Sequence, residues 1–85
     1  MLAARRPTRV RWYLVGLGGE SDLHTPHWHG NVVLHDGKRT DVIALSPAQM
    51  ETVDMVPDDP GIWMYHCHLD EHMQAGMVAM YKVEP

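Results

Sequence analysis

The sequence predicts an all-β protein, a sandwich or barrel built from short strands. Several segments alternate apolar and polar side chains with a period of two residues, which is typical of half-buried strands. Turn-forming residues recur about every ten residues along the chain. No segment has the periodicity of a long helix, and there are no heptads or internal repeats. A length of 85 residues predicts one domain, covering residues 1–85.

The first predicted strand covers residues 9–16 (RVRWYLVG), in which one face is apolar and the other carries charged and aromatic side chains. Residues 1–8 before it are expected to form a flexible lead-in. Glycines after the strand lead into a loop through Ser21 and Asp22. Four arginines cluster near the N-terminus and are interpreted as solvated rather than as a binding patch: Arg5, Arg6, Arg9 and Arg11.

Further strands follow, separated by turn residues. They are predicted at residues 24–30, 31–35, 40–45, 49–56, 61–66 and 78–83. Asp36 and Gly37 form a strong hairpin-turn signal, and residues 58–61 (DDPG) predict a tight turn. Residues 69–74 are too few for more than a single helical turn.

The composition argues against two classes of protein. The chain has 11 Asp and Glu residues against 7 Lys and Arg, a formal net charge of -4. Nucleic-acid-binding proteins usually carry a basic face, so we expect no nucleic-acid partner. No segment reaches the roughly 18 apolar residues of a membrane span, and no signal peptide is visible. Seven histidines and seven methionines are unusual for this length.

One motif combines the side chains that copper prefers. Residues 66–77 read HCHLDEHMQAGM, so that Cys67 is flanked by two histidines and followed by His72 and Met77. Thiolate, thioether and imidazole ligands suit copper, and two histidines with one cysteine and a weak axial methionine form the blue-copper set. Cys67 is the only cysteine and cannot form an internal disulfide. The motif therefore predicts a metal site.

A second motif, HTPHWHG at residues 24–30, adds three histidines. In a strand, residues two apart share a face and neighbours point to opposite faces. This rule predicts two metal sites on opposite sides of one strand. The first contains His24, Cys67, His72 and Met77; the second contains His27, His29, His66 and His68. A structural zinc site is the chemical alternative, but it needs neither the methionine nor so many histidines.

At these residues the chain resembles a known family. The segments VRWYLVGLGGESDLHTPHWHG, PGIWMYHCHLDEH and AGMVAMYKV resemble the C-terminal half of the last cupredoxin domain of multicopper oxidases, most like the ferroxidase branch of the ceruloplasmin and hephaestin type. The resemblance implies a cupredoxin-like Greek-key β-sandwich, truncated at its N-terminal strands. It implies a type 1 copper held by His24, Cys67, His72 and Met77, a type 2 copper on His27, and type 3 copper on His29, His66 and His68.

The resemblance also implies an activity. A small reduced substrate (Fe²⁺, Cu⁺ or a phenol) gives electrons to the type 1 copper. Cys67 passes them through His66 and His68 to a type 2/type 3 cluster that reduces O₂ to water. Glu71, directly before His72, is interpreted as a contact for a substrate metal. These oxidases usually work outside the cytoplasm, which implies a periplasmic or secreted location.

The chain supplies only half of the histidines that such a cluster contains in the family. It is expected to be a fragment of a longer oxidase, to pair with a second cupredoxin domain on another chain, or to form a homo-oligomer. An alternative function is a blue-copper electron-transfer module without oxidase activity. That alternative, like a copper-storage protein, leaves the four histidines of the second site without a role.

Overall fold

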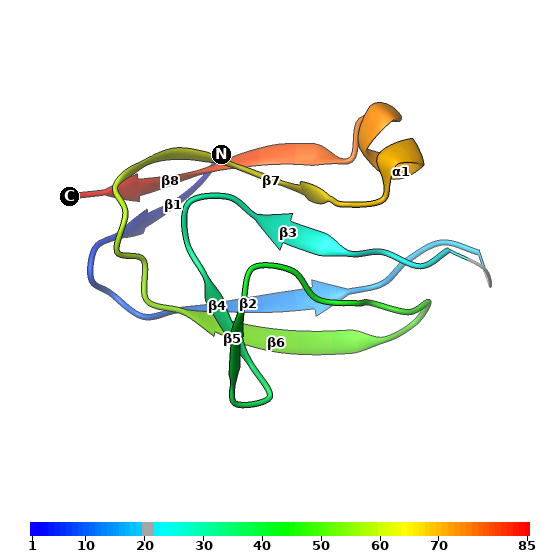
Figure 1. Cartoon of the computed structure of the whole chain (residues 1–85), viewed down its shortest axis with the longest axis horizontal. Helices are drawn as coiled ribbons and strands as arrows, with labels where there is room; N and C mark the ends of the chain where they lie inside the picture. The colour runs from blue at the N-terminus through cyan, green and yellow to red at the C-terminus, as the bar shows by residue number, and fades with distance from the viewer. Residues whose placement is uncertain (20–21) are drawn as a thin grey trace.

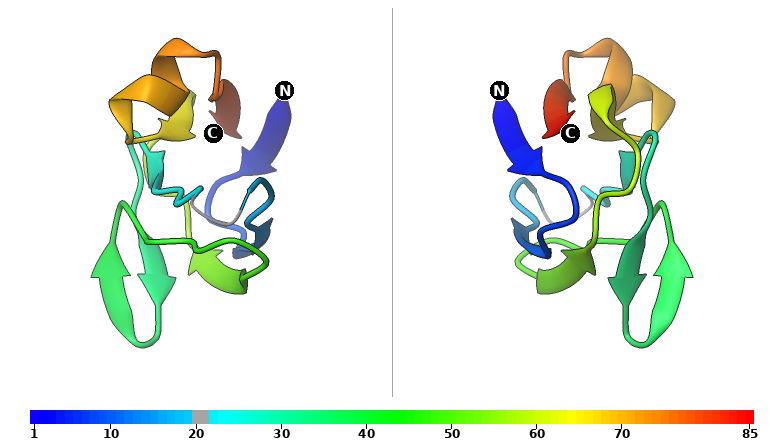
Figure 2. Two further views of the ribbon diagram at one scale, coloured as in Figure 1. Left: turned by 90° about the vertical axis from the view of Figure 1, so that its right-hand side faces the viewer. Right: turned by 90° about the vertical axis from the view of Figure 1, so that its left-hand side faces the viewer.

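The computed structural model describes residues 1–19 and 22–85, and it consists of two β-sheets packed face to face (Figure 1). The elements are β1 (Leu2–Arg5), β2 (Val10–Val15), β3 (Pro26–Trp28), β4 (Val33–His35), β5 (Lys38–Thr40), β6 (Met50–Met55), β7 (Gly61–Cys67), α1 (Asp70–Gln74) and β8 (Val78–Glu84). The end-on views separate the two layers (Figure 2). The predicted all-β class is confirmed.

The first sheet has the strand order β1-β8-β7-β3. Strand β7 pairs antiparallel with β8 on one side and with β3 on the other, while β1 pairs parallel with β8 at the edge. The pairing of β3 with β7 sets Pro26 opposite Cys67 and His27 opposite His66. This register brings the two histidine motifs side by side, although they are far apart in the sequence.

The second sheet has the order β2-β6-β4-β5. Strands β2 and β6 pair along their full length, from Val10 opposite Met55 to Val15 opposite Met50. Strands β4 and β5 form a hairpin whose turn residues, Asp36 and Gly37, have φ values of 49° and 77°. Positive φ at both turn positions is the geometry that an Asp-Gly pair favours in a two-residue hairpin. The predicted hairpin turn is confirmed.

The core lies between the sheets and follows the period of two. Its buried members come from four strands, β3, β4, β6 and β8: Trp28, Val33, Val53, Met55, Tyr81 and Val83, joined by Ile43 from a connecting segment. Trp12 of β2 packs edge-on against Trp28 and Tyr81 from the opposite sheet, with ring centroids 5.7 and 5.8 Å apart. These aromatic contacts hold the two sheets together directly beneath the histidine motifs.

The N-terminal region differs from the prediction. A flexible lead-in was expected over residues 1–8, whereas Leu2–Arg5 forms strand β1. Arg9 and Arg11 both form ion pairs with Asp54 of β6, and their side chains stay 64% and 51% exposed, which agrees with the interpretation of the arginines as solvated. Strand β1 arises from its pairing with the distant strand β8. The predicted loop after β2 includes Ser21, which lies outside the described residues.

Two other predicted strands are shorter or displaced. Residues 40–45 contain only isolated bridges, His24 with Leu45 and His27 with Val42, while the strand in this region is β5. The strand predicted over residues 24–30 is confined to β3, Pro26–Trp28. Helix α1 is the single turn expected near residues 69–74. Among the described residues, no helix has the length and apolarity needed to cross a bilayer.

Candidate metal centre

Strand β7 separates two groups of side chains that could each hold a metal ion. His24, Cys67 and His72 form one group; His27, His29 and His66 form the other. Within each group the ligand atoms all lie within 4.8 Å of one another. His66 and Cys67 are neighbours in β7 and therefore point to opposite faces. The structure thus brings together three of the four residues predicted for each site, on the two sides predicted.

The first group, which we call the cysteine group (His24, Cys67 and His72), is assembled from three elements. His24 precedes β3, Cys67 ends β7 and His72 lies in α1. The Sγ atom of Cys67 is 3.6 Å from Nδ1 of His72, and the rings of His24 and His72 have centroids 4.8 Å apart. The fourth predicted ligand, Met77, lines the same pocket.

The turn that carries Met77 is tied back to this group through its backbone. The Met77 amide donates to the His72 carbonyl, and the Cys67 amide donates to the Met77 carbonyl, each at 3.1 Å. The Met77 side chain is 46% exposed, whereas Cys67 is only 3% exposed. Met77 therefore forms the more exposed wall of the pocket that contains the cysteine group.

The hydrogen bonds of His24 indicate a metal ligand. Its Nε2 donates to the carbonyl of Leu17 at 2.9 Å, which raises the pKa of the imidazole. Its Nδ1 is buried and has no hydrogen-bond partner within the described part of the chain. Metal-binding histidines commonly hold one ring nitrogen on a carbonyl in this way and present the other as a lone pair.

The surroundings of Cys67 favour the thiolate form of its side chain. Burial raises the pKa of its thiol. Hydrogen bonds from the amides of Thr25 and Leu69 and from the imidazole of His72, together with the nearby His24 imidazole, outweigh burial and lower the pKa from 9.0 to about 6. The thiolate is the form that binds metals. A soft thiolate beside two imidazoles and a thioether fits copper by donor type.

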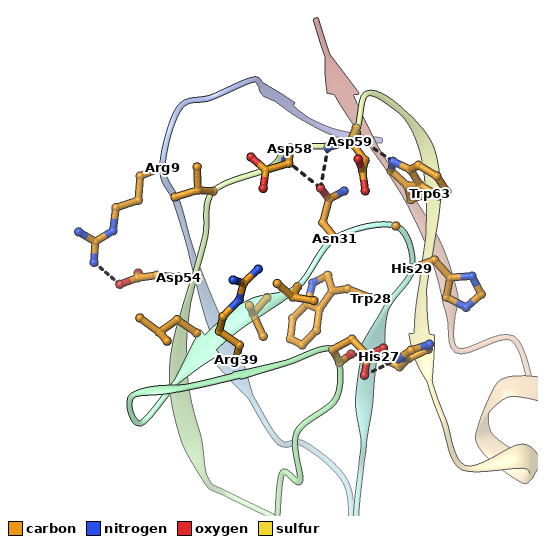
Figure 3. A pocket seen from close by; sticks show the side chains of 16 residues that line it. Arg9, His27, Trp28, His29, Asn31, Arg39, Asp54, Asp58, Asp59 and Trp63 are labelled. Atoms are coloured by element: carbon orange, nitrogen blue, oxygen red, sulfur yellow. Dashed lines mark hydrogen bonds and ion pairs between the residues drawn. The ribbon is translucent and has the colours of Figure 1, made fainter.

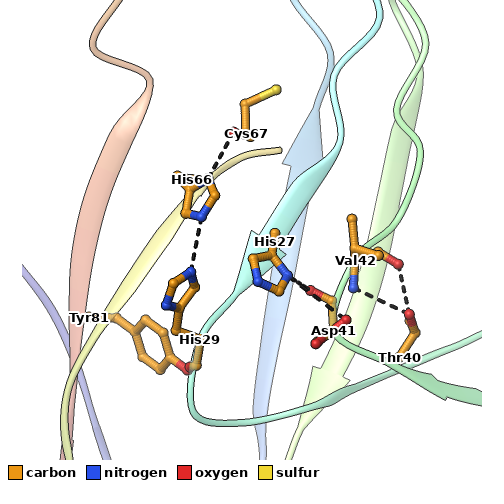
Figure 4. Close-up of polar contacts among 8 residues, drawn as sticks. All are labelled: His27, His29, Thr40, Asp41, Val42, His66, Cys67 and Tyr81. Atoms are coloured by element: carbon orange, nitrogen blue, oxygen red, sulfur yellow. Dashed lines mark hydrogen bonds and ion pairs between the residues drawn. The ribbon is translucent and has the colours of Figure 1, made fainter. Parts of the chain in front are cut away.

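The second group, which we call the histidine group (His27, His29 and His66), presents three Nε2 atoms to one space (Figure 4). Nδ1 of His27 donates to the Asp41 carbonyl at 2.9 Å, and Nδ1 of His66 donates to the Cys67 carbonyl at 2.8 Å. Both Nε2 atoms are thereby left as acceptors. Nε2 of His29 and Nε2 of His66 lie 3.0 Å apart.

The histidine group is partly shielded from water. His66 is 8% exposed. Burial, followed by repulsion from His27 and His66, lowers the pKa of His29. A metal binds imidazole in its neutral form, so a lowered pKa favours binding.

His68 stands at the edge of the histidine group. Its ring centroid lies 5.3 Å from that of His27 and 6.0 Å from that of His66. Its backbone amide donates to the Thr25 carbonyl at 2.9 Å. The side chain is exposed and lies outside the three-residue group. His68 therefore lies beside the histidine group without joining it, and its role as a metal ligand stays a prediction.

A buried network that the sequence motifs do not reveal holds His29 in place. The hydroxyl of Tyr81 donates to the His29 carbonyl and accepts from Nδ2 of Asn31 at 3.1 Å. Oδ1 of Asn31 accepts the amides of Asp58 and Asp59 at 3.0 and 3.1 Å (Figure 3). A polar residue directly after HWHG in an apolar strand region was the only sequence signal for Asn31. Nothing local pointed to Tyr81.

Gly30 supports the same position. It has a φ of +76°, and a Cβ atom built there would lie 2.1 Å from the Trp63 ring. The Trp63 indole nitrogen donates to the Asp59 carbonyl at 2.9 Å (Figure 3). This hydrogen bond fixes the ring that lies against Gly30. The backbone can therefore turn directly after His29 only because residue 30 has no side chain.

Glu71 lies on the exposed face of α1. Within the described residues it belongs to no cluster of side chains that could hold a metal ion. The neighbouring acid, Asp70, accepts a hydrogen bond from Nε2 of Gln74 at 2.9 Å. A contact between Glu71 and a substrate metal therefore stays a prediction.

Comparisons with known proteins agree with this geometry. A family model described as multicopper oxidase matches residues 1–85. The chain is 43% identical over 77 residues to ceruloplasmin and 43% identical over 76 residues to hephaestin, both from Homo sapiens. The matches cover 87% and 89% of the chain but only 7% of each relative.

Solved structures show the same fold. The chain superposes on a multi-copper oxidase from Pseudomonas thermotolerans with a TM-score of 0.84, at 31% identity, covering 98% of the chain and 22% of that structure. A multi-copper oxidase from Pediococcus acidilactici gives a TM-score of 0.91 at 21% identity, covering 100% of the chain and 21% of that structure. The latter likeness concerns the fold alone, a cupredoxin-like sandwich.

Proposed function

Because the chain belongs to the multicopper oxidase family, whose cofactor is copper, we propose that it forms the electron-entry part of an oxidase that reduces O₂ to water. In this proposal, electrons from a reduced substrate enter at a type 1 copper and pass to a type 2/type 3 cluster. One observation carries the proposal: two groups of copper ligands lie on opposite faces of β7 and are joined by the adjacent residues His66 and Cys67.

The ligands are assigned from the family resemblance of the two motifs, and the arrangement of the two groups supports the assignment. The cysteine group with Met77 holds type 1 copper. His27 holds type 2 copper, while His29, His66 and His68 hold type 3 copper. The 3.0 Å separation of the His29 and His66 Nε2 atoms supports a shared ion for these two residues. His68, which is set apart from them, then binds the other ion of the pair.

The chain's own residues provide the connection between the two groups. Bound copper supplies one-electron chemistry and the activation of O₂. Cys67 is linked to His66 and His68 through its backbone, and the His66 imidazole also donates to the Cys67 carbonyl at 2.8 Å. The cysteine sulfur is thus connected to an imidazole of the histidine group by covalent bonds and one hydrogen bond. Burial of Cys67 and His66 keeps water away from this path.

The substrate is part of the proposal. The relatives include proteins named ferroxidase, and Glu71 is an exposed carboxylate one residue from His72. A hard carboxylate ligand beside the electron-entry site suits Fe²⁺ better than a phenol. We therefore favour metal oxidation of the ferroxidase type, with Fe²⁺ as substrate, over phenol oxidation of the laccase type. A periplasmic or secreted location belongs to the same proposal.

The histidine group needs a partner. It offers half of the ligands expected, and the chain spans about 7% of the relatives' length, so we propose that a second cupredoxin domain completes the cluster. That domain belongs to the same protein, a separate chain or a second copy.

The outer face of β7 and β8 is the surface that we assign to this partner. Met64 pairs with Met80 and His66 pairs with Val78, all on the side away from Cys67. Ile62, Val78 and Met80 on this face are 55%, 42% and 43% exposed. Exposed apolar side chains in a row are typical of a surface that another domain covers. This row ends beside the histidine group, which needs further ligands from a partner.

A blue-copper electron carrier is the second candidate, and it would use the cysteine group alone. The oriented Nε2 atoms of the histidine group favour the oxidase. Metal analysis, visible absorption and oxygen uptake of the copper-loaded protein separate the two. Intense blue absorption with more than one copper per chain and oxygen uptake supports the oxidase. One copper with blue colour and no oxygen uptake supports the carrier, and colourless protein contradicts both.

A further inference from the structure

We infer that Thr40 is a positioning residue for His27. Its hydroxyl holds the peptide group whose carbonyl, that of Asp41, orients the His27 imidazole toward the space shared by the histidine group. The inference rests on the proposed function, because it takes His27 as a copper ligand. It adds a residue that lies outside both histidine motifs and that can be tested with and without metal.

The Asp41 carbonyl fixes the His27 side chain and the β3 backbone together. It accepts a hydrogen bond from the Trp28 amide and another from Nδ1 of His27, each at 2.9 Å. The Asp41 carboxylate contributes less to this contact, because its Oδ1 lies 3.8 Å from Nδ1 and the side chain is 54% exposed. The orientation of the His27 ring therefore depends on the direction of a backbone carbonyl.

Thr40 holds the other end of the same peptide group. It is the last residue of β5, where the chain leaves the second sheet and runs beside β3. Its Oγ1 accepts the Val42 amide at 3.2 Å and donates to the Val42 carbonyl at 2.8 Å (Figure 4). The Val42 amide and the Asp41 carbonyl belong to one planar peptide group and point in opposite directions. The peptide is thus held at its N–H by the hydroxyl and at its C=O by Trp28 and His27.

Loss of the hydroxyl should loosen the contact with His27. Within the described residues, the Thr40 hydroxyl is the only protein partner of the Val42 amide. A rotation of the peptide that turned this amide toward water would also turn the Asp41 carbonyl away from the ring, because the group is rigid. The bond to the amide also polarises the carbonyl and strengthens its bond to Nδ1. Ring orientation and the choice of the protonated nitrogen both depend on such a bond in metal-binding histidines.

The test removes the hydroxyl and leaves all proposed ligands unchanged. Thr40→Val deletes the hydroxyl and keeps the branched shape, while Thr40→Ser keeps the hydroxyl and is the matched control. Thr40→Ala deletes the same group with a smaller side chain, so the result does not depend on how one side chain fits. On metal-free protein, nitrogen–proton NMR correlations of the His27 ring report which nitrogen carries the proton. On copper-loaded protein, the type 2 signal is followed against a competing chelator, with the blue band as the internal reference.

We expect the unmodified protein to carry the His27 ring proton on Nδ1. In Thr40→Val and Thr40→Ala, the ratio of this tautomer to the other should fall about fivefold, as for the loss of one hydrogen bond. Type 2 copper should bind about tenfold more weakly, the smaller of the effects usual when a residue that orients a metal ligand is changed. The blue band should persist in both variants, and Thr40→Ser should match the unmodified protein.

Three results would overturn the inference. These are a His27 proton on Nε2 in the unmodified protein, an unchanged tautomer ratio in Thr40→Val and Thr40→Ala, and an equal change in Thr40→Ser. Absence of a type 2 signal from the unmodified copper-loaded protein would contradict the proposed function instead. The measurement on metal-free protein would still decide the role of Thr40.

Discussion

The Nδ1 atom of His66 lies 2.8 Å from the carbonyl oxygen of Cys67, so the two adjacent residues are joined by a hydrogen bond as well as by the peptide. The hydrogen bond fixes the His66 ring with Nδ1 on this carbonyl and Nε2 facing His29. One short segment of β7 therefore fixes the geometry of both metal-binding groups. The predictions below test these groups separately.

Replacing His68 by alanine should leave the cysteine group intact and abolish oxygen reduction. His68 contributes no side chain to the cysteine group, and its backbone amide, which holds Thr25, is unchanged by the substitution. The blue absorption band of the copper-loaded protein should be retained, while oxygen uptake should fall by at least about a hundredfold, as expected for loss of a metal ligand.

His35→Ala is the control for this variant, because His35 pairs with Glu51 at 3.2 Å and belongs to neither metal-binding group. It should retain both the blue band and oxygen uptake. Oxygen uptake that survives in His68→Ala would contradict the assignment of His68 to the cluster.

Replacing Met80 by lysine should prevent the partner domain from docking. Met80 is 43% exposed on the outer face of β8, and burying a lysine in an apolar interface is costly. Sedimentation equilibrium should show loss of the assembly if the partner is a second copy or a separate chain. In all cases the type 2 and type 3 copper signals should decrease while the blue band persists.

Met50→Lys provides the matched control, since Met50 is 78% exposed on the other sheet. It should leave assembly and the cluster signals unchanged. If Met80→Lys behaves in the same way, the partner contacts a different face. An unmodified protein without any cluster signals would contradict the proposed function rather than the docking face.

The metal-free protein should become more stable as pH rises from about 6 to 9. The pKa of Cys67 is lowered from 9.0 to about 6 in the fold. A group with a lowered pKa contributes its full stabilisation above the unfolded pKa and loses it as pH falls through the folded value. Urea unfolding of metal-free protein across this range measures the effect. Cys67→Ser should remove this part of the pH dependence, and an equal slope in both proteins would exclude the thiolate as its source.

Gly30→Ala should destabilise the fold far more than Gly37→Ala. The two glycines have nearly the same φ, +76° and +77°, so the backbone strain of a substitution is similar. A Cβ at Gly30 would overlap the Trp63 ring, whereas a Cβ at Gly37 has no atom within 4 Å. The difference in the free energy of unfolding should be about 1–3 kcal/mol, the usual cost of overpacking. Similar losses in both variants would show that Trp63 moves aside freely.

Much of the fold could be predicted, because short strands and turns depend on the order of apolar, polar and turn-forming residues within a few positions. The alternation in residues 9–16 and 49–56 corresponds to β2 and β6, and the Asp36-Gly37 turn forms as expected. Strand β1 could not be predicted. Its pairing partner is β8, at the other end of the chain, and a short segment with little alternation gives no sign of such a parallel contact.

The sequence by itself determined the chemistry of the centre. Residue types and the period of two residues per strand were enough to name the candidate ligands and to divide them between two faces, since neighbouring side chains in a strand must diverge. The tertiary structure alone decided how the ligands are held. The pairing of β3 with β7, the Asn31–Tyr81 network under His29 and the Thr25 amide on Cys67 all join residues that are distant in the sequence. Such contacts depend on how the strands pair and the sheets pack, and local sequence does not encode them.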